Sequence, residues 1–411
     1  MRIGIFTDSY TPYISGLVTS EVMLKEALEK QGHTVYVVTA NLESFRYTYD
    51  EKEKIIKIPG VPVGIYDARL TGIYPLQAIQ TIKNWNLDVI HSQTEFGVGT
   101  FARIIAKQFN IPIVHTYHTM YEDYVHYITK GHFMGASKKV VQYLTKFYCD
   151  KTITELIVPT KKAYDLFKEK YRVERNVHII PTGIQVERFY KENFKKEDII
   201  KLRKSLGLSP KDFVLTFVGR LGKEKSVDFL IECHKDIVKK HSNAKLLIIG
   251  DGPEMGDFVS QVQELKLENS VIFTGKVAWE DIPLYYQLTD VFVTASKTET
   301  QGLTVIEAMA ASIPIVCMND ESFKIAVVDD LNGYFFNTQD EYKKIINRLI
   351  ENPKELKRLA NQARVSSEMH SSKYFANKVL GVYQLAIEEK KKNSKLSNKI
   401  KNTIRKVFHG E

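Results

Sequence analysis

The chain has 411 residues, 44% of them hydrophobic and 26% charged, with a formal net charge of +9. This length predicts two or three domains, and the composition is that of a globular protein able to bury sizeable cores. The three cysteines, Cys149, Cys233 and Cys317, lie far apart, which fits a reducing cytosol and excludes a disulfide framework and a cysteine-rich zinc site. We expect no signal peptide and no membrane-spanning segment.

The first part of the chain alternates strand-like and helix-like segments. Residues 2–6 predict a strand, 20–31 a helix that stops at Gly32, and 34–39 a second strand. Further strands are predicted at 89–91 and 111–115, with a helix at 100–108. Strands that alternate with helices predict a parallel, doubly wound α/β sheet.

A second α/β series follows the charged, apolar-poor stretch 190–204. Its strands are predicted at 213–218, 245–249, 271–274, 291–295 and 313–317, and its helices at 226–240, 254–265 and 303–311. Beyond Ile345 the pattern is almost wholly helical, and we expect residues 371–390 to reach back to the first domain. The predicted boundaries are 1–195, 196–370 and 371–411, the last with a basic tail.

In the second series, Arg220 and Lys225 follow a predicted strand and precede a helix. An arginine fork and a mobile lysine suit a diphosphate and its developing charge, although such loop cations are often only solvated. The glycine-rich turn after the next strand resembles a dinucleotide fingerprint, but its last glycine, Gly256, comes one residue late and Pro253 interrupts it. An NAD site is therefore disfavoured. A tight turn without a ligand remains open.

Glu299 and Glu307 frame the most informative stretch, Glu-Thr-Gln-Gly-Leu-Thr-Val-Ile-Glu, after the strand at 291–295. Gly302 and Leu303 stand at the predicted helix N-terminus, where unpaired backbone N–H groups and the helix dipole favour a phosphate. Because carboxylates repel phosphate, we expect the glutamates to accept hydrogen bonds from hydroxyls. A sugar nucleotide supplies both groups.

In the first series, His118 follows the strand at 111–115, where ligands of α/β sheets collect. Tyr121, Tyr124 and Tyr127 recur every three residues after it and predict either an aromatic groove for a sugar or acyl chain, or a packed helix face. Gly16, after the first strand, would let backbone approach a phosphate, although many such glycines only make turns.

Two segments are basic and amphipathic. Lysines including Lys138, Lys139 and Lys146 lie between residues 130 and 151, with Val140, Leu144, Phe147 and Tyr148 at helical spacing. Residues 390–411 hold eight Lys or Arg against one Glu, with apolar residues on one helical face. Such helices suit an anionic lipid surface, whereas a solvated tail and a packed first-domain helix are the simpler alternatives. The tail lacks the stacking aromatics of single-strand binders, so we expect no nucleic acid partner.

Several chemistries are excluded by missing motifs. The sequence has no phosphate-binding Gly-x4-Gly-Lys-Ser/Thr loop, no His-Glu-x2-His and no Gly-x-Ser-x-Gly. No two aspartates stand two apart, so the acidic pair of many metal-dependent sugar transferases is missing. We therefore expect no obligatory metal and no cofactor.

These residues together resemble the retaining glycosyltransferases of family four. The motifs are Gly16, His118, Gly219-Arg220, Lys225, the turn 250–253 and Glu299-x7-Glu307, and the resemblance extends to about residue 385. It implies a GT-B fold, α/β, with two Rossmann-like domains facing a cleft and C-terminal helices returning to the first. The stretches at 6–12, 91–96 and 115–118 look like the bacterial diacylglycerol glucosyltransferases, or monoglucosyldiacylglycerol synthases. Those make glycolipids at the cytoplasmic face of the membrane.

The resemblance implies a role for each matched position. Arg220 and Lys225 would hold the donor diphosphate with the backbone of Gly302 and Leu303, and Gly16 would approach it from the first domain. Further roles would be Glu299 on the donor sugar, Glu307 on the ribose, Lys276 and Val277 on the uracil, and His118 on the transferred sugar. No protein nucleophile is implied, because the leaving phosphate takes the acceptor proton.

Two positions depart from the family pattern, and several activities stay open. Ser226 and Ser15 stand where members often have glycine, which could alter loop dynamics without removing a charge. The leading prediction is a membrane-associated enzyme, peripheral on the inner face of the cell membrane, that moves glucose from UDP-glucose to diacylglycerol. Alternatives are addition of a second glucose or galactose to a monoglycosyl lipid, a soluble transferase with a non-lipid acceptor, and a non-catalytic nucleotide-sugar sensor.

Overall fold

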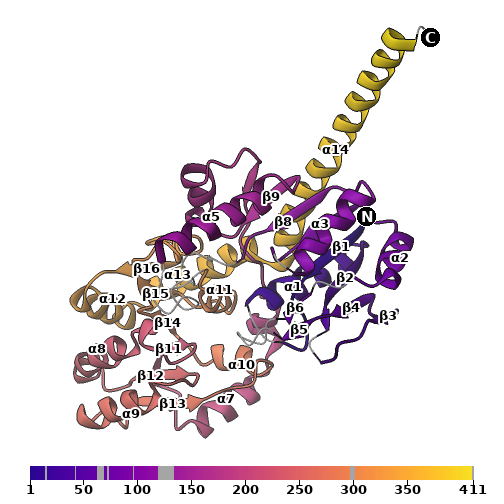
Figure 1. Ribbon diagram of the computed structural model, residues 1–411. Helices are drawn as coiled ribbons and strands as arrows, with labels where there is room; N and C mark the ends of the chain where they lie inside the picture. Colours follow the sequence, from indigo (N-terminus) through magenta and orange to yellow (C-terminus); the bar gives the residue numbers. More distant parts are fainter. Residues whose placement is uncertain are drawn as a thin grey trace. The chain divides into compact units, whose positions relative to one another are not determined.

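The computed structural model describes residues 1–13, 16–41, 43–62, 69–71, 74–95, 97–118, 134–296 and 301–409, with backbone alone at 61–62, 69–70, 134–141 and 396–409. The chain forms two compact units (Figure 1). Unit 1 comprises Met1–Gly183 and Phe375–Glu411, and unit 2 comprises Ile184–Tyr374. Each has its own sheet and core, as the two α/β series predict.

Unit 1 is built on an eight-stranded sheet in the order β10-β9-β8-β7-β1-β2-β4-β3. The neighbours pair in parallel except β3 and β4. The strands are β1 (Arg2–Thr7), β2 (Thr34–Asn41), β3 (Thr48–Asp50), β4 (Ile55–Pro59), β7 (Val89–Ser92), β8 (Ile113–Thr116), β9 (Glu155–Val158) and β10 (Val177–Ile179). A separate antiparallel pair joins β5 (Val61–Pro62) to β6 (Arg69–Leu70).

Helices cover both faces of this sheet because successive strand residues point to opposite sides. The helices are α1 (Gly16–Lys30), α2 (Leu76–Trp85), α3 (Val98–Gln108), α5 (Met134–Asp150), α6 (Lys161–Asp165) followed by a π-helical turn (Leu166–Lys170), and α14 (Ser372–His409). One core combines the sheet with α2 and α3: Phe6, Val38, Ile90, Ile82, Phe101 and Ile105. The other combines it with α1 and α14: Ile3, Ile5, Val37, Leu24, Leu28, Val379 and Tyr383. The predicted return of the C-terminal helix to the first domain is therefore confirmed.

Unit 2 contains a six-stranded, all-parallel sheet in the order β13-β12-β11-β14-β15-β16. The strands are β11 (Phe213–Val218), β12 (Ala244–Ile249), β13 (Val271–Gly275), β14 (Val291–Thr294), β15 (Ile315–Met318) and β16 (Gly333–Phe336). This is the strand order of a Rossmann sheet, which reverses direction of growth between β11 and β14. Ligands of such sheets bind at the carboxyl ends of the strands beside that reversal.

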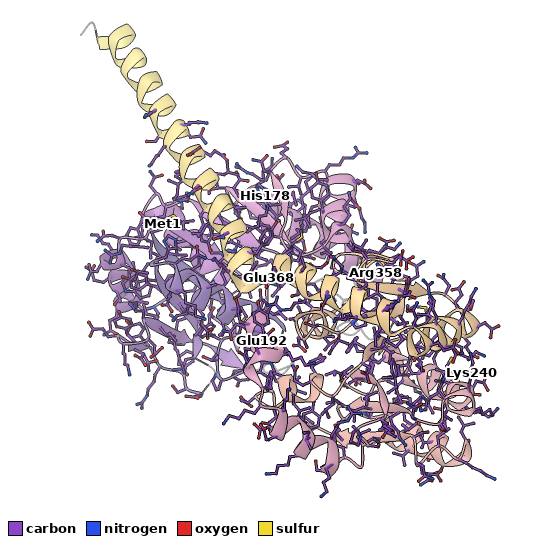
Figure 2. All side chains as sticks on the ribbon, turned by 180° about the vertical axis from the view of Figure 1, so that it is seen from behind. Met1, His178, Glu192, Lys240, Arg358 and Glu368 are labelled. Atoms are coloured by element: carbon purple, nitrogen blue, oxygen red, sulfur yellow. The ribbon has the colours of Figure 1, made fainter. Side chains whose placement is uncertain are left out.

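The helices of unit 2 again form two layers. They are α7 (Lys196–Ser205), α8 (Val227–Lys240), α9 (Met255–Glu264), α10 (Ile282–Tyr286), α11 (Leu303–Ala310), α12 (Gln339–Glu351) and α13 (Pro353–Ser367), with 3-10 turns at Val186–Phe189 (η2), Lys191–Asn193 (η3), Lys223–Lys225 (η4) and Glu368–His370 (η5). Buried residues of α8, α9 and α12 pack on one face of the sheet. Those of η2, α11 and α13 pack on the other. Figure 2 labels Lys240, the last residue of α8, and Arg358, which lies within α13.

Two sequence-based boundaries differ from the structure. The first unit ends at Gly183, twelve residues before the predicted boundary at 195, because Ile184, Val186 and Phe189 pack into the core of unit 2. The chain leaves and re-enters unit 1 at one place, where the Ile184 N–H donates to the His370 carbonyl at 2.9 Å. Helix α1 begins at Gly16 rather than at residue 20.

Candidate functional site

An open pocket of about 580 Å³ lies in unit 2 at the carboxyl ends of β11, β12 and β13. Its lining consists of Val218, Gly219, Arg220, Ile249, Gly250, Asp251, Gly252, Lys276, Val277 and Ile282. Three residues predicted to bind a nucleotide sugar, Arg220, Lys276 and Val277, therefore come together although they lie on two different loops. The pocket combines an exposed arginine with exposed backbone and apolar side chains, which suits a phosphate next to a flat ring.

The glycine-rich turn forms one wall of this pocket. Gly250 has φ +139°, and a Cβ there would lie 1.9 Å from the Gly219 carbonyl oxygen. A Cβ on Gly252 would lie 2.3 Å from the carbonyl oxygen of Leu221. The Leu221 N–H also donates to the Asp251 carbonyl at 3.0 Å. The two glycines thus allow the backbone segments that follow β11 and β12 to touch. This close packing accounts for the glycines of the turn without a ligand.

The loop that carries Lys225 contacts the loop that follows β14. Lys225 ends η4, and the Ser296 hydroxyl donates to the Glu224 carbonyl at 3.5 Å. Both loops lie beside the point where the strand order reverses. Gly302 is the residue before α11, with φ +64°, and a Cβ there would lie 2.9 Å from Phe323 Cε1. Glu299 lies outside the described residues.

Ser226, which departs from the family pattern, adopts the left-handed conformation (φ 50°, ψ 44°) that favours glycine, and its side chain makes no capping hydrogen bond to α8. We expect Ser226→Gly to be more stable than Ser226→Ala by about 0.5 to 1 kcal/mol, because the relief of left-handed strain exceeds glycine's extra unfolded-state entropy. Thermal unfolding of both variants measures the difference. Equal stability would contradict it.

Glu307 receives a hydrogen bond from α10. The Tyr286 hydroxyl donates to Glu307 Oε2 at 2.8 Å and lies 3.2 Å from the Thr304 carbonyl oxygen. Burial raises the pKa of Glu307 to about 7, against the opposing effects of the Tyr286 hydrogen bond and the charge of Arg188. The carboxyl group therefore changes its charge near neutral pH.

Arg188 connects Glu307 to the loop that follows β13. Its guanidinium lies 3.4 Å from the centre of the Trp279 ring, two residues beyond the pocket residue Val277. Arg188, Tyr286 and Trp279 were not predicted from the sequence. The predicted boundary at 195 assigned Arg188 to the other domain, and no local pattern marked the two aromatic residues.

The structure does not bring every predicted donor residue into one pocket. Lys225, Gly302, Leu303 and Glu307 belong to unit 2 but are not among the described residues that line the 580 Å³ pocket. Lys225 lies in η4, which follows β11, and the other three lie on or beside α11, which follows β14, whereas the pocket is lined mainly from the ends of β11, β12 and β13.

In unit 1, His118 lies just beyond the carboxyl end of β8. Its Nε2 is 2.7 Å from Oε1 of Gln93, which follows the neighbouring strand β7. Burial lowers the pKa of His118 to about 4, and the nearby Glu95 opposes this shift only in part. The ring is therefore neutral at physiological pH and can donate one hydrogen bond and accept another.

A buried polar cluster lies beneath this position. His115 Nε2 is 3.1 Å from Glu95 Oε1, and Cys149 completes the one group of three possible metal ligands within the described ranges. Arg103 lies in the same cluster, donating to the Ser92 hydroxyl at 3.2 Å and the Gly99 carbonyl at 2.8 Å. A fixed guanidinium charge disfavours a metal ion beside it. These residues are better suited to a polar core network.

Gly16 and Asp8 lie close to the carboxyl end of β1. A Cβ on Gly16, the first residue of α1, would meet no atom of the described residues within 4 Å, so packing against that part of the chain does not account for the glycine. Asp8 accepts a hydrogen bond of 2.7 Å from the Val98 N–H at the start of α3. Burial raises the pKa of Asp8 to about 7. Asp8 thus adds a titratable carboxyl that the sequence did not single out.

The predicted acceptor residues are described only in part. Tyr121, Tyr124 and Tyr127 lie outside the described residues, and Lys138 and Lys139 are described by their backbone in α5. Later in α5, Tyr143 is 71% exposed and Phe147 is 44% exposed, while Cys149 is buried and Lys146 is half-buried. Phe147 therefore does not belong to a simple buried stripe. Tyr143 and Phe147 are thus exposed on the same helix as Lys146.

The basic C-terminal segment continues α14 as helix to His409. This agrees with the helical spacing predicted for the tail, whose side chains beyond Lys395 are not described. Within the described part of the chain, no helix has the length and apolar character needed to cross a membrane.

Both parts of the chain match family models of glycosyltransferases. Residues 14–188 match the family model described as Glycosyltransferase Family 4, and residues 198–366 match that of Glycosyl transferases group 1. The alpha-monoglucosyldiacylglycerol synthase of Acholeplasma laidlawii is 37% identical over 97% of this chain and 100% of its own. The synthase of the same name from Streptococcus pneumoniae is 37% identical over 86% of this chain and 79% of its own.

Solved structures show the same fold. Anabaena Alr3699/HepE in complex with UDP has a TM-score of 0.69 at 19% identity, covering 93% of this chain and all of that one. The same protein in complex with UDP-glucose has a TM-score of 0.66. The predicted GT-B fold, with two Rossmann-like parallel sheets, is therefore confirmed. The protein belongs to the glycosyltransferases of family four, and it is a hexosyltransferase similar to the alpha-monoglucosyldiacylglycerol synthases.

Proposed function

We propose that the protein transfers glucose from UDP-glucose to 1,2-diacylglycerol with retention of configuration, giving alpha-monoglucosyldiacylglycerol. The observation that carries this proposal is the pocket of unit 2, where Arg220, Lys276 and Val277 meet at the carboxyl ends of a Rossmann sheet. The names of the two synthases support the acceptor, and the UDP-glucose complex of the Anabaena protein supports the donor.

The donor is held by two kinds of group: cations and backbone N–H groups bind its diphosphate, and carboxylates bind its hydroxyls. Arg220 and Lys225 bind the diphosphate oxygens, with the N–H groups of Gly302 and Leu303 at the start of α11. Lys276 and Val277 contact the uracil through their backbone, and Glu307 accepts hydrogen bonds from the ribose. Glu299 holds hydroxyls of the donor sugar. Gly16 is a further candidate for the diphosphate, because the described residues leave open space beside it.

The reaction replaces one bond at the anomeric carbon by another on the same face of the sugar. The bond from C1 to the diphosphate oxygen breaks, the diacylglycerol hydroxyl oxygen bonds to C1, and its proton passes to the leaving phosphate. Arg220 and Lys225 stabilise the negative charge that develops on that phosphate. Neutral His118 accepts a hydrogen bond from a hydroxyl of the transferred sugar. No cofactor or obligatory metal is part of this scheme.

The acceptor reaches the enzyme from a membrane surface, where we place the protein peripherally on the inner face of the cell membrane. Exposed Tyr143 and Phe147 on α5 lie beside Lys146, and Lys138 and Lys139 precede them on the same helix. Aromatic side chains that enter the headgroup region and lysines that bind anionic lipid suit this helix to a membrane. Tyr121, Tyr124 and Tyr127 are further candidates for contact with the acceptor.

The proposal is tested by incubating the protein with radiolabelled UDP-glucose and mixed micelles that contain diacylglycerol and anionic lipid. We expect one labelled lipid that co-migrates with alpha-monoglucosyldiacylglycerol. A parallel panel with UDP-galactose and with monoglucosyldiacylglycerol as acceptor separates the alternative, addition of a second sugar. Absence of labelled lipid at every anionic-lipid fraction would overturn the proposal.

Deletion of residues 390–411 is expected to weaken binding to anionic vesicles by about tenfold or more, because each Lys or Arg near the surface contributes roughly 1 kcal/mol. Raising the salt concentration is likewise expected to weaken the binding of the full-length protein to anionic vesicles. Vesicle sedimentation measures both effects. A variant with glutamine at Lys201, Lys354 and Lys357, exposed lysines of unit 2, is the charge control. If the truncated and full-length proteins sedimented equally with vesicles, the tail would not bind lipid and would be only a solvated terminus.

A further inference from the structure

A chain of hydrogen bonds in unit 1, buried except at its His118 end, links helix α14 to His118. His118 Nε2 is 2.7 Å from Gln93 Oε1, and Gln93 Nε2 is 3.2 Å from His91 Nδ1. His91 Nδ1 is in turn 2.7 Å from the hydroxyl of Tyr383 on α14. Gln93, His91 and Tyr383 are all buried, so their polar groups need hydrogen-bond partners within the protein.

The donors and acceptors of this chain form one consistent pattern. With His91 as the tautomer protonated at Nε2, its Nε2–H donates to the Thr116 hydroxyl at 2.7 Å, and the single lone pair of Nδ1 accepts chiefly from the Tyr383 hydroxyl, with the Gln93 amide N–H as a second, longer contact. The Gln93 carbonyl oxygen then accepts from His118 Nε2–H. His118 is thereby held as the tautomer whose other nitrogen, Nδ1, accepts hydrogen bonds.

The Tyr383 hydroxyl is not explained by packing alone. The Tyr383 ring lies in the core between the sheet and α14 with Val379 and Ala386, where phenylalanine would fill the same volume. Its ring meets that of His91 edge to face, with centroids 5.4 Å apart. The hydroxyl adds a polar group to an apolar core and places it on His91, at a separation of 292 residues in the chain.

We propose that Tyr383 and His91 are positioning residues that act through Gln93 to hold the tautomer and orientation of His118. This deepens the proposed function and rests on it, since His118 is taken to accept a hydrogen bond from the transferred sugar. Helix α14 then completes the site of unit 1, as well as covering its sheet. Without the Tyr383 hydroxyl, His91 is free to carry its proton on Nδ1, where it no longer accepts from the Gln93 amide. Gln93 then turns its N–H toward His118 Nε2, which favours the other His118 tautomer, and that tautomer presents a donor to the sugar.

The test combines kinetics with 15N NMR of the histidine rings in the full-length protein. For Tyr383→Phe we expect the ring nitrogen signals of His118, assigned with His118→Asn, to shift toward a mixture of tautomers. We expect kcat for glucosyl transfer to fall about threefold to tenfold, the loss of one hydrogen bond, with the KM for UDP-glucose nearly unchanged. Tyr342→Phe removes the hydroxyl of an equally buried tyrosine in unit 2 and is expected to change neither the His118 signals nor kcat.

A double-mutant cycle separates this role from a structural one. In the Gln93→Leu background, Tyr383→Phe is expected to lower kcat no further, because the link to His118 is already broken. Losses that simply add, or unchanged His118 signals in Tyr383→Phe, would overturn the proposal. A wild-type protein that labels no lipid would overturn the proposed function instead, and the NMR result would still decide whether Tyr383 positions His118. Thermal unfolding confirms that each variant is folded.

Discussion

Arg220→Ala is expected to lower kcat/KM for UDP-glucose about 100- to 1000-fold, the range found when one preorganised charge-stabilising donor is removed. Arg220 directly follows β11 beside the strand reversal and lines the unit 2 pocket with Lys276 and Val277. The interaction strengthens as the sugar leaves the diphosphate, so most of the loss should be in kcat. Steady-state kinetics with diacylglycerol micelles measures it.

Two further arginine variants make this result specific. Arg220→Lys keeps the charge but loses the planar fork, and we expect an intermediate loss of about tenfold. Arg358→Ala removes another exposed arginine of unit 2, one that is paired with Asp330 at 2.7 Å, and should leave the kinetics unchanged (Figure 2). If Arg220→Ala lost less activity than Arg220→Lys, the diphosphate assignment would be wrong.

Glu307→Ala is expected to raise the KM for UDP-glucose roughly 10- to 100-fold, the loss of a charged hydrogen bond to the ribose. In the wild type, the KM should also rise as the pH falls through about 7, because the protonated carboxyl no longer accepts from both hydroxyls. Glu307→Gln should remove this pH dependence. A pH dependence that persists in Glu307→Gln would assign it to another group, such as Asp8, whose pKa is also raised to about 7.

Tyr286→Phe tests the cause of the titration. The Tyr286 hydrogen bond lowers the pKa of Glu307, so its loss should move the midpoint to higher pH. The raised pKa of Glu307 also makes the stability of the fold depend on pH. Because burial raises the folded-state pKa above 4.5, the fold favours protonated Glu307, and this stabilisation is lost as the pH rises from about 4.5 through 7. Glu307→Gln should therefore gain thermal stability relative to wild type at pH 8 but not at pH 4.

The periodicity of apolar residues was enough to predict the framework of both units. The strand expected at 213–218 coincides with β11, and the helix expected at 226–240 differs from α8 by one residue. The return of the last helix to the first unit was also predicted. These features depend on residues close together in the chain, where an alternation of two or of 3.6 residues decides which face is buried.

The sequence also singled out Arg220, Lys225 and Glu307 as candidate site residues, because they follow predicted strands or lie in the next helix, where ligands of α/β sheets bind. It could not pair Tyr286 with Glu307, or place Arg188 on Trp279 rather than in the first domain. It gave no sign that Tyr383 would meet His91. Such contacts join residues of different elements, and they exist only once the sheets and helices have packed. Local pattern thus determined the elements and the candidate charged residues, whereas tertiary packing decided which side chains these residues contact and how burial shifts their pKa.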